Sequence, residues 1–163
     1  MTELYHHRVL SPWGDILLLS DGTALTRLEL PGSRFPSPRN QIGEAKSALP
    51  VFREAQQELA AYFAGKLRAF MVPFDLRGTP FQTKVWLALS KVQYGKTVTY
   101  SDLAEKIQQP TAVRAVAMAN ARNPLPIIVP CHRVIGKDGA LTGYSGGGIE
   151  RKAALLQLEG VLL

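Results

Sequence analysis

Apolar residues in the first thirty positions occur in short runs separated by turn-forming residues. This pattern predicts strands over 7–10, 15–19 and 26–30. The segments between them, 11–14 and 20–23, contain the Pro, Gly, Asp and Ser residues that are typical of tight turns. Because tight turns join antiparallel neighbours, we predict a β-meander at the start of the chain.

Residues 32–43 are rich in Pro, Ser and Arg and have no periodicity, which predicts a surface loop. Helical periodicity begins at about Pro50 and continues to Ala64, and Gly65 is a residue type that commonly ends a helix. The apolar face of this predicted helix comprises Phe52, Ala55, Leu59, Tyr62 and Phe63. We interpret its aromatic residues as part of the core.

A second helical pattern follows a connecting segment. Thr79 and Gln82 predict a capping box, and Pro80 occupies the first helical position. The apolar stripe of this helix comprises Phe81, Val85, Trp86, Leu89 and Val92. A new helix after a linker indicates a domain boundary, so we predict an N-terminal α/β domain over 1–77 and a C-terminal domain over 78–163.

The next two predicted helices cover 99–107 and 111–121, with a turn at 108–110 and Thr111 as the cap of the second helix. Two short helices joined by a tight turn are the helix-turn-helix pattern of many DNA-binding proteins. Small residues fill the second helix. They serve either close packing between helices or close approach to another molecule.

The last predicted helix covers about 149–159 and stops at Gly160. Glu159 lies in its final turn, where a carboxylate opposes the helix dipole by roughly a few tenths of a kcal/mol. The sequence offers no evident compensation, so we predict a functional role for Glu159.

The chain has 163 residues, of which 46% are hydrophobic, and this is enough to bury a core. No apolar stretch approaches the roughly 20 residues of a membrane span, and the first residues lack the features of a signal peptide. We therefore expect a cytoplasmic protein with no membrane partner. Residues 1–79 carry nine Lys or Arg against eight Asp or Glu, whereas 80–163 carry ten against five. A basic second half suggests a polyanionic partner.

Cys131 is the only cysteine, and His132 follows it directly. One cysteine forms no internal disulfide, and a free thiol suits a reducing compartment. A neighbouring base or a positive helix end lowers the pKa of a thiol and creates the nucleophilic thiolate. The alternative is structural, because an unpaired cysteine after an apolar strand is often a small buried hydrophobe.

The segment Ile128-Val129-Pro130-Cys131-His132-Arg133-Val134-Ile135-Gly136 resembles the O6-alkylguanine-DNA alkyltransferases, also called methylated-DNA-protein-cysteine methyltransferases. Further matches occur in family order and at family-like spacing across 78–160. They are Gly78-Thr79-Pro80-Phe81-Gln82, Val85-Trp86, Tyr100, Arg114-Ala115-Val116, Asn123-Pro124, Thr142-Gly143-Tyr144-Ser145-Gly146-Gly147 and Glu159-Gly160. In the first half, 61–65 is similar to bacterial members.

The resemblance implies an α/β (α+β) fold in two parts. A small antiparallel-sheet, ribonuclease H-like domain with one helix is followed by a helical, winged helix-turn-helix-like domain. The implied activity is DNA repair by direct damage reversal. A methyl or larger alkyl group is transferred irreversibly from O6 of guanine to Cys131, with O4 of thymine as an alternative source, so each molecule acts once.

By the same resemblance, His132 accepts the Cys131 proton, directly or through water, and Glu159 stabilises the resulting imidazolium. Tyr100 protonates or polarises the departing guanine. Asn123 fixes the turn between the second helix of the helix-turn-helix and the active site, with a plain Asn-Pro turn as its alternative.

A base inside stacked duplex DNA must be extruded before a thiol can reach it. The resemblance implies that the helix over 111–121 enters the minor groove and that Arg114 inserts into the vacated stack, with a phosphate contact as its alternative. The small residues implied to allow close approach are Ala112, Ala115 and Ala119. The residues implied to line the base pocket are Val134, Tyr144 and Ser145. A core role is the alternative for Tyr144.

Two features depart from the family pattern. Ala117 occupies a position that is usually glycine, and the glycine loop after Ser145 is one residue longer than in some relatives. His6 and His7 have no cysteine nearby, so we predict that the chain lacks the structural zinc site that some relatives carry and has no metal site. We expect no cofactor, a monomer in solution, and double-stranded DNA containing O6-alkylguanine as the partner.

Two other classes of function remain as alternatives. The first is a non-catalytic binder, either an alkyltransferase-like lesion binder or a helix-turn-helix regulator, but such lesion binders lack the acceptor cysteine that Cys131 supplies here. The second is a Cys-His hydrolase, which would need an oxyanion hole and turnover and would leave Arg114 without a purpose.

Overall fold

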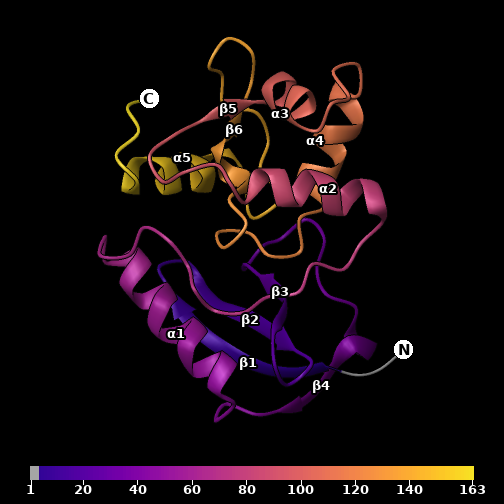
Figure 1. Ribbon diagram of the computed structural model, residues 1–163. Coiled ribbons are helices and arrows are strands. Elements are labelled where there is room, and N and C mark those ends of the chain that lie inside the picture. Colours follow the sequence, from indigo (N-terminus) through magenta and orange to yellow (C-terminus); the bar gives the residue numbers. More distant parts are fainter. Residues whose placement is uncertain (1–3) are drawn as a thin grey trace. The chain divides into compact units, whose positions relative to one another are not determined.

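The computed structural model describes residues 4–163, which form two compact units (Figure 1). The first unit ends at Asp75 and the second begins at Leu76. Each unit buries apolar side chains of its own. Within residues 4–163, no helix is long and apolar enough to cross a membrane.

The first unit is built on a four-stranded sheet in the order β3-β2-β1-β4. Strands β1 (Leu4–Ser11), β2 (Gly14–Ser20) and β3 (Leu25–Glu29) form antiparallel pairs, which confirms the predicted meander. Strand β4 (Ile42–Ala45) follows a 3-10 turn, η1 (Arg39–Gln41), and pairs in parallel with β1. The sheet is therefore mixed, and the predicted loop ends in a strand. Strand β4 has only four residues, and none of their side chains is buried. The segment therefore lacks the alternation of buried and exposed positions that predicts a strand.

Helix α1 (Pro50–Phe63) contacts β1 and β2 through its apolar face. The helix is confirmed, although Phe63 is only half-buried. Its buried side chains are Val51, Phe52, Ala55, Leu59 and Tyr62. After the helix, Gly65 adopts a φ of +75°, a left-handed conformation that glycine adopts without strain and that commonly ends helices.

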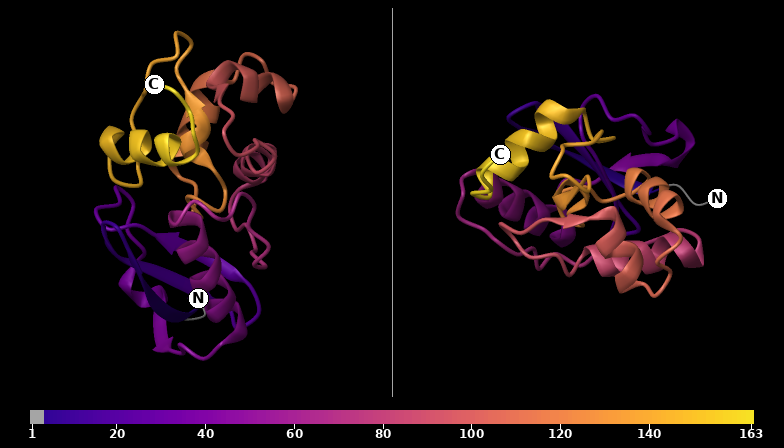
Figure 2. Two further views of the ribbon diagram at one scale, coloured as in Figure 1. Left: turned by 90° about the vertical axis from the view of Figure 1, so that its left-hand side faces the viewer. Right: turned by 90° about the horizontal axis from the view of Figure 1, so that it is seen from above.

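The second unit begins with helix α2 (Pro80–Leu89), followed by α3 (Tyr100–Lys106) and α4 (Val113–Ala121). These three helices contact one another (Figure 2). Thr79 caps α2 in a capping box with Gln82, as predicted. The last helix is α5 (Ile149–Leu158).

Helix α4 starts two residues later than predicted, because the chain between α3 and α4 makes one more turn. The Ala112 N–H donates to the Gln109 carbonyl at 2.9 Å, so Thr111 lies inside a turn and does not cap the helix. The N-cap is Ala112, and its side chain makes no capping hydrogen bond. The cap prediction for Thr111 is wrong for this reason.

Trp86 connects α2 to α4. Its indole Nε1 donates a hydrogen bond of 2.8 Å to the Ala119 carbonyl. A Cβ atom added at Gly78 would lie 2.5 Å from the Trp86 ring, so only glycine lets the start of this unit pass so close to the indole. Trp86 therefore attaches α2 to α4, the helix that carries Arg114, and Gly78 leaves room for the Trp86 ring.

Candidate active site

Cys131 lies at the start of a 3-10 turn, η2 (Cys131–Arg133), after a buried segment. Every residue from 124 to 134 is buried, and Cys131 is 2% exposed. The apolar run before the cysteine is wound into turns and forms no strand. Ile127 has a φ of +74°, which is an unusual and strained conformation for a β-branched residue.

Two asparagines connect this wound segment to α4. The Asn123 side chain donates to the Val129 carbonyl at 2.7 Å and accepts from the Leu125 N–H at 3.0 Å. Asn120, a buried residue of α4, has its Nδ2 3.5 Å from the Cys131 carbonyl. Asn123 belongs to the sequence motif and is predicted by it, whereas Asn120 has no sequence signal beyond being an amide within a helix of small residues.

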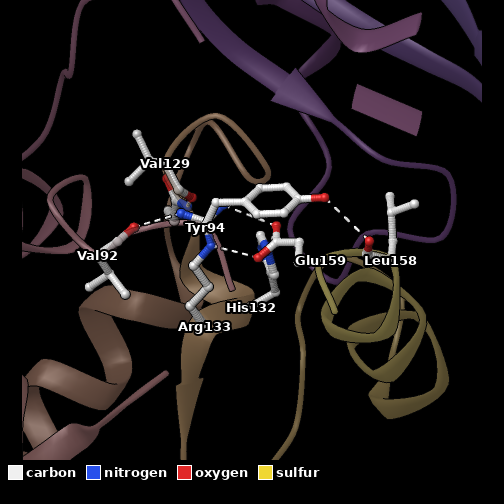
Figure 3. A network of polar contacts seen from close by, with 8 residues as sticks. Val92, Tyr94, Val129, His132, Arg133, Leu158 and Glu159 are labelled. Carbon is white, nitrogen blue, oxygen red and sulfur yellow. Dashed lines mark hydrogen bonds and ion pairs between the residues drawn. The ribbon is translucent and has the colours of Figure 1, made fainter. Parts of the chain in front are cut away.

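The carboxylate of Glu159 binds the side chains of His132 and Arg133, the two residues that follow Cys131 in the chain (Figure 3). His132 Nε2 lies 2.7 Å from Glu159 Oε2. Arg133 Nε and Nη2 donate to the two Glu159 oxygens at 2.8 and 3.0 Å, and Arg133 Nη1 donates to the Val92 carbonyl at 2.6 Å. All three side chains of this cluster are buried.

The Arg133 contact explains why Glu159 occupies an unfavourable position. Glu159 is the C-cap of α5, where its charge opposes the helix dipole. The guanidinium beside it supplies the missing compensation. Arg133 was not among the predicted site residues, although an arginine within a buried motif is itself a sign that a carboxylate lies nearby.

The hydrogen bonds decide which nitrogen of His132 can act as a base. Burial lowers the pKa of His132, the hydrogen bond and charge of Glu159 raise it, and the charges of Arg133 and Lys152 lower it. In the neutral ring, Nε2 must carry the proton, because an ionised carboxylate only accepts. Nδ1 is then left as an acceptor, and it has no hydrogen-bond partner among residues 4–163.

Burial works against ionisation of Cys131. It raises the pKa of the thiol above its ordinary value, whereas hydrogen bonding to Asn123, the positive charge of Lys152 and hydrogen bonding to Tyr144 act in the opposite direction. Ionisation of the Cys131 thiol is therefore disfavoured by its surroundings, and a nearby base would help to remove its proton.

Lys152 of α5 is the second ionisable residue that the sequence analysis did not identify. Its side chain is fully buried, and its Nζ lies 3.4 Å from both the carbonyl and the Oγ1 of Thr142. Burial lowers its pKa to about 8, and the nearby Cys131 opposes this shift. The same Thr142 Oγ1 lies 2.6 Å from the Tyr100 hydroxyl, which connects Tyr100 to this side of the site.

The predicted pocket residues lie on two parts of the second unit, the short strand after the cysteine and the loop before α5. Val134 is buried in β6 (Val134–Ile135), which pairs in parallel with β5 (Val98–Thr99). Tyr144 is 8% exposed. Ser145 is half-buried and donates to the Ala121 carbonyl at 2.6 Å, at the end of α4.

The predicted DNA-facing residues of α4 separate into two groups. Arg114 and Ala115 are exposed, and Ala112 is half-buried. Ala119 is 3% exposed, and its carbonyl receives the Trp86 hydrogen bond. Ala119 therefore faces α2, and its predicted contact with DNA is corrected to a packing role.

The two adjacent histidines of the first unit form hydrogen bonds within that unit. His6 Nδ1 donates to the Gly43 carbonyl and His7 Nε2 donates to Gln56 Oε1, each at 2.7 Å. Within residues 4–163, no three His, Cys, Asp or Glu residues are grouped to hold a metal ion.

The chain is similar to known proteins along almost its whole length. Family models for 6-O-methylguanine DNA methyltransferase match residues 4–76 (ribonuclease-like domain) and 80–161 (DNA binding domain). A methylated-DNA–protein-cysteine methyltransferase of Mycobacterium bovis is 48% identical over 157 residues, which cover 96% of this chain and 93% of the relative. The constitutive methyltransferase of Bacillus subtilis is 43% identical over 156 residues, covering 95% and 94%.

Solved structures agree with these similarities. The crystal structure of the Mycobacterium tuberculosis O6-methylguanine methyltransferase has a TM-score of 0.86 at 47% identity, and the match covers 96% of this chain and 92% of that chain. A crystal structure of Mycobacterium tuberculosis OGT in complex with DNA has a TM-score of 0.84 at 46% identity, with 95% and 92% covered.

Glu159→Ala should destabilise the protein strongly, because it leaves the buried Arg133 and His132 without their carboxylate. We expect the free energy of unfolding to fall by about 3–5 kcal/mol in urea denaturation. Glu150→Ala is the control: Glu150 is exposed in the first turn of α5, and its loss should cost less than about 1 kcal/mol. Equal effects of the two variants would contradict a central role for Glu159.

Lys152→Met should make Cys131 harder to ionise, because it removes a positive charge that favours the thiolate. We expect the midpoint of thiolate formation, followed by absorbance at 240 nm, to move up by about one pH unit. The chain has one cysteine and five tyrosines, and tyrosinate also absorbs near 240 nm, so the signal of Cys131 is the difference from the matching Cys131→Ser protein. Lys91→Met, which removes an exposed lysine of the same unit, should not move the midpoint. An unchanged midpoint in Lys152→Met would show that the thiol does not sense this charge.

Proposed function

Because the chain belongs to the 6-O-methylguanine DNA methyltransferase family, we propose that Cys131 is the residue that accepts the alkyl group. The protein repairs DNA by transferring an alkyl group to a cysteine of its own. One observation carries the assignment: Cys131 is the only cysteine in the chain. No other residue can be the acceptor in a protein-cysteine methyltransferase.

In the proposed reaction, the Cys131 sulfur attacks the alkyl carbon on O6 of guanine. The S–C bond forms as the C–O6 bond breaks, and guanine leaves with the electron pair of that bond. The thiol proton passes to His132 Nδ1, through one water molecule, and Glu159 stabilises the imidazolium. This route is supported by the hydrogen-bond pattern, which leaves Nδ1 as the acceptor nitrogen.

Two further groups complete the proposed chemistry. Tyr100 protonates or polarises the departing guanine; in the first case the imidazolium of His132 supplies the replacement proton through solvent, and in the second a hydrogen bond from the hydroxyl is enough. The Tyr100 hydroxyl lies 2.6 Å from Thr142 Oγ1. Asn123 holds the turn between α4 and Cys131 through its two hydrogen bonds. The base pocket is formed by Val134, Tyr144 and Ser145. We propose O6-alkylguanine as the lesion that this pocket accepts.

The proposed DNA contact is the exposed side of α4, acting in the minor groove. Arg114 fills the space that the extruded nucleotide leaves, and Ala115 lets the helix backbone approach closely. In support, both residues are exposed, and the chain has no Asp or Glu between Lys106 and Lys137. We propose that the 78–163 domain carries both DNA binding and alkyl transfer, and that the protein acts as a cytoplasmic monomer.

Cys131→Ser should abolish transfer and leave DNA affinity nearly intact, because a hydroxyl is far less acidic and nucleophilic than a thiol. Intact-mass measurement after mixing with an O6-methylguanine duplex should show one added methyl group on the wild-type protein and none on the variant. Excess substrate should add no further methyl. Methylation of the serine variant, or more than one product molecule per protein, would overturn the assignment.

Arg114→Ala should slow repair of a duplex far more than transfer from free O6-benzylguanine, because only the duplex requires base extrusion. Extrusion costs a few kcal/mol, so we expect about a tenfold or larger loss in single-turnover rate on the duplex. Arg114→Lys should restore DNA affinity more than repair, since lysine keeps the charge without the planar guanidinium. Equal slowing on both substrates would mean that Arg114 supports the fold instead.

A further inference from the structure

An apolar side chain lies in the middle of the exposed face of α4. Met118 is 68% exposed, which is among the highest exposures of large apolar residues in the described chain. The exposed face of α4 comprises Arg114, Ala115, Met118 and the C-cap residue Arg122. The opposite side of the helix is formed by Val116, Ala119 and Asn120, which are buried.

A single exposed apolar residue needs no special explanation, but the surroundings of Met118 are unusual. Arg114 precedes it by four residues and Arg122 follows it by four, so each arginine is a neighbour on the same helical face. No Asp or Glu occurs between Lys106 and Lys137. The face therefore presents an apolar centre between two positive charges.

This arrangement matches the chemistry of a DNA groove. Phosphates at the rims attract guanidinium groups, whereas sugars and base edges inside the groove offer surface to an uncharged side chain. Apolar side chains of minor-groove proteins, methionine among them, commonly wedge between or against base steps. A methionine is flexible and polarisable, so it adapts to such a surface.

We propose that Met118 is an apolar wedge that packs against the duplex beside the position from which the nucleotide is extruded. The inference rests on the proposed function, in which α4 enters the minor groove. Four residues advance a helix by about 6 Å, and successive bases of one strand are about 3.4 Å apart. If the axis of α4 runs along the groove, a side chain one helical turn from Arg114 therefore lies one to two base steps from the vacated stack.

The residues around Met118 strengthen the argument. Ala115 and Ala121 lie three residues before and after Met118 and are small, so they let the helix backbone approach the duplex while Met118 protrudes from it. Burying the exposed thioether against sugar and base edges removes apolar surface from water. Met118 thus favours the bent or opened duplex without contributing a charge.

The first test compares Met118→Ala on two substrates. We expect about a tenfold lower single-turnover rate on an O6-methylguanine duplex, from the lost apolar burial, and a change within about twofold on free O6-benzylguanine. Met118→Leu should recover most of the duplex rate, because leucine keeps the apolar volume. The matched control is Leu87→Ala, since Leu87 is a 51% exposed apolar residue of α2 in the same unit. It should change neither rate.

The second test separates apolar from electrostatic contact in the unreactive Cys131→Ser protein. Adding Met118→Ala should lower duplex affinity without changing the slope of log affinity against log salt, because no phosphate contact is lost. Adding Arg122→Ala instead should reduce that slope by about one. A salt slope altered by Met118→Ala would contradict an apolar wedge.

The outcomes distinguish this inference from the proposed function. If Arg114→Ala slows duplex repair but Met118→Ala behaves like Leu87→Ala, the wedge is wrong and the minor-groove function stands. If neither Arg114→Ala nor Met118→Ala affects duplex repair, the proposed use of α4 fails as a whole. If Met118→Ala slows the duplex and the free base equally, Met118 acts on the fold and the wedge is again wrong.

Discussion

The buried carboxylate of Glu159 is the interaction on which the second unit depends. It holds the end of α5 to η2 by accepting hydrogen bonds from Arg133 and His132 at once. A buried charge is tolerable only when it is paired and hydrogen-bonded, and here the pairing also sets the tautomer of the histidine next to the only cysteine. The same contact therefore stabilises the fold and leaves Nδ1 of His132 as an acceptor.

Burial both protects the Cys131 thiol from solvent and makes it harder to ionise. Cys131 is 2% exposed, and burial raises its pKa, which disfavours the nucleophilic thiolate. Asn123, Tyr144 and Lys152 partly counter this effect. A low-dielectric site strengthens each of these interactions, although burial remains the larger effect on the thiol.

Helix α4 connects the surface to the thiol within one short stretch of chain. Trp86 holds the inner side of the helix through the Ala119 carbonyl, which leaves the other side exposed. Asn120 and Asn123 then tie the end of the helix to the segment that carries Cys131. The helix with the exposed face is thus joined to the cysteine segment through these two asparagine side chains.

The sequence alone determined the features that depend on local pattern. Short apolar runs separated by turn residues predicted the meander of β1 to β3, the Thr79 and Gln82 pair predicted the start of α2, and the motif around Cys131 indicated the family. These signals are contained in a few neighbouring residues, so no knowledge of the fold was needed to read them. Local reading failed where its signal was weak or ambiguous, as at the four-residue strand β4 and at Thr111.

Only the tertiary structure decided which distant residues meet. It paired Arg133 with Glu159, buried Lys152 near Cys131, turned Ala119 toward α2 and left Met118 in solvent. In the sequence, Lys152 resembled an ordinary helix cation and Ala119 resembled the other small residues of its helix. The direction in which a side chain points is set by the packing of whole helices, and the ionisation of a buried group is set by its surroundings. Neither the direction of a side chain nor its ionisation can therefore be predicted from the residues next to it in the sequence.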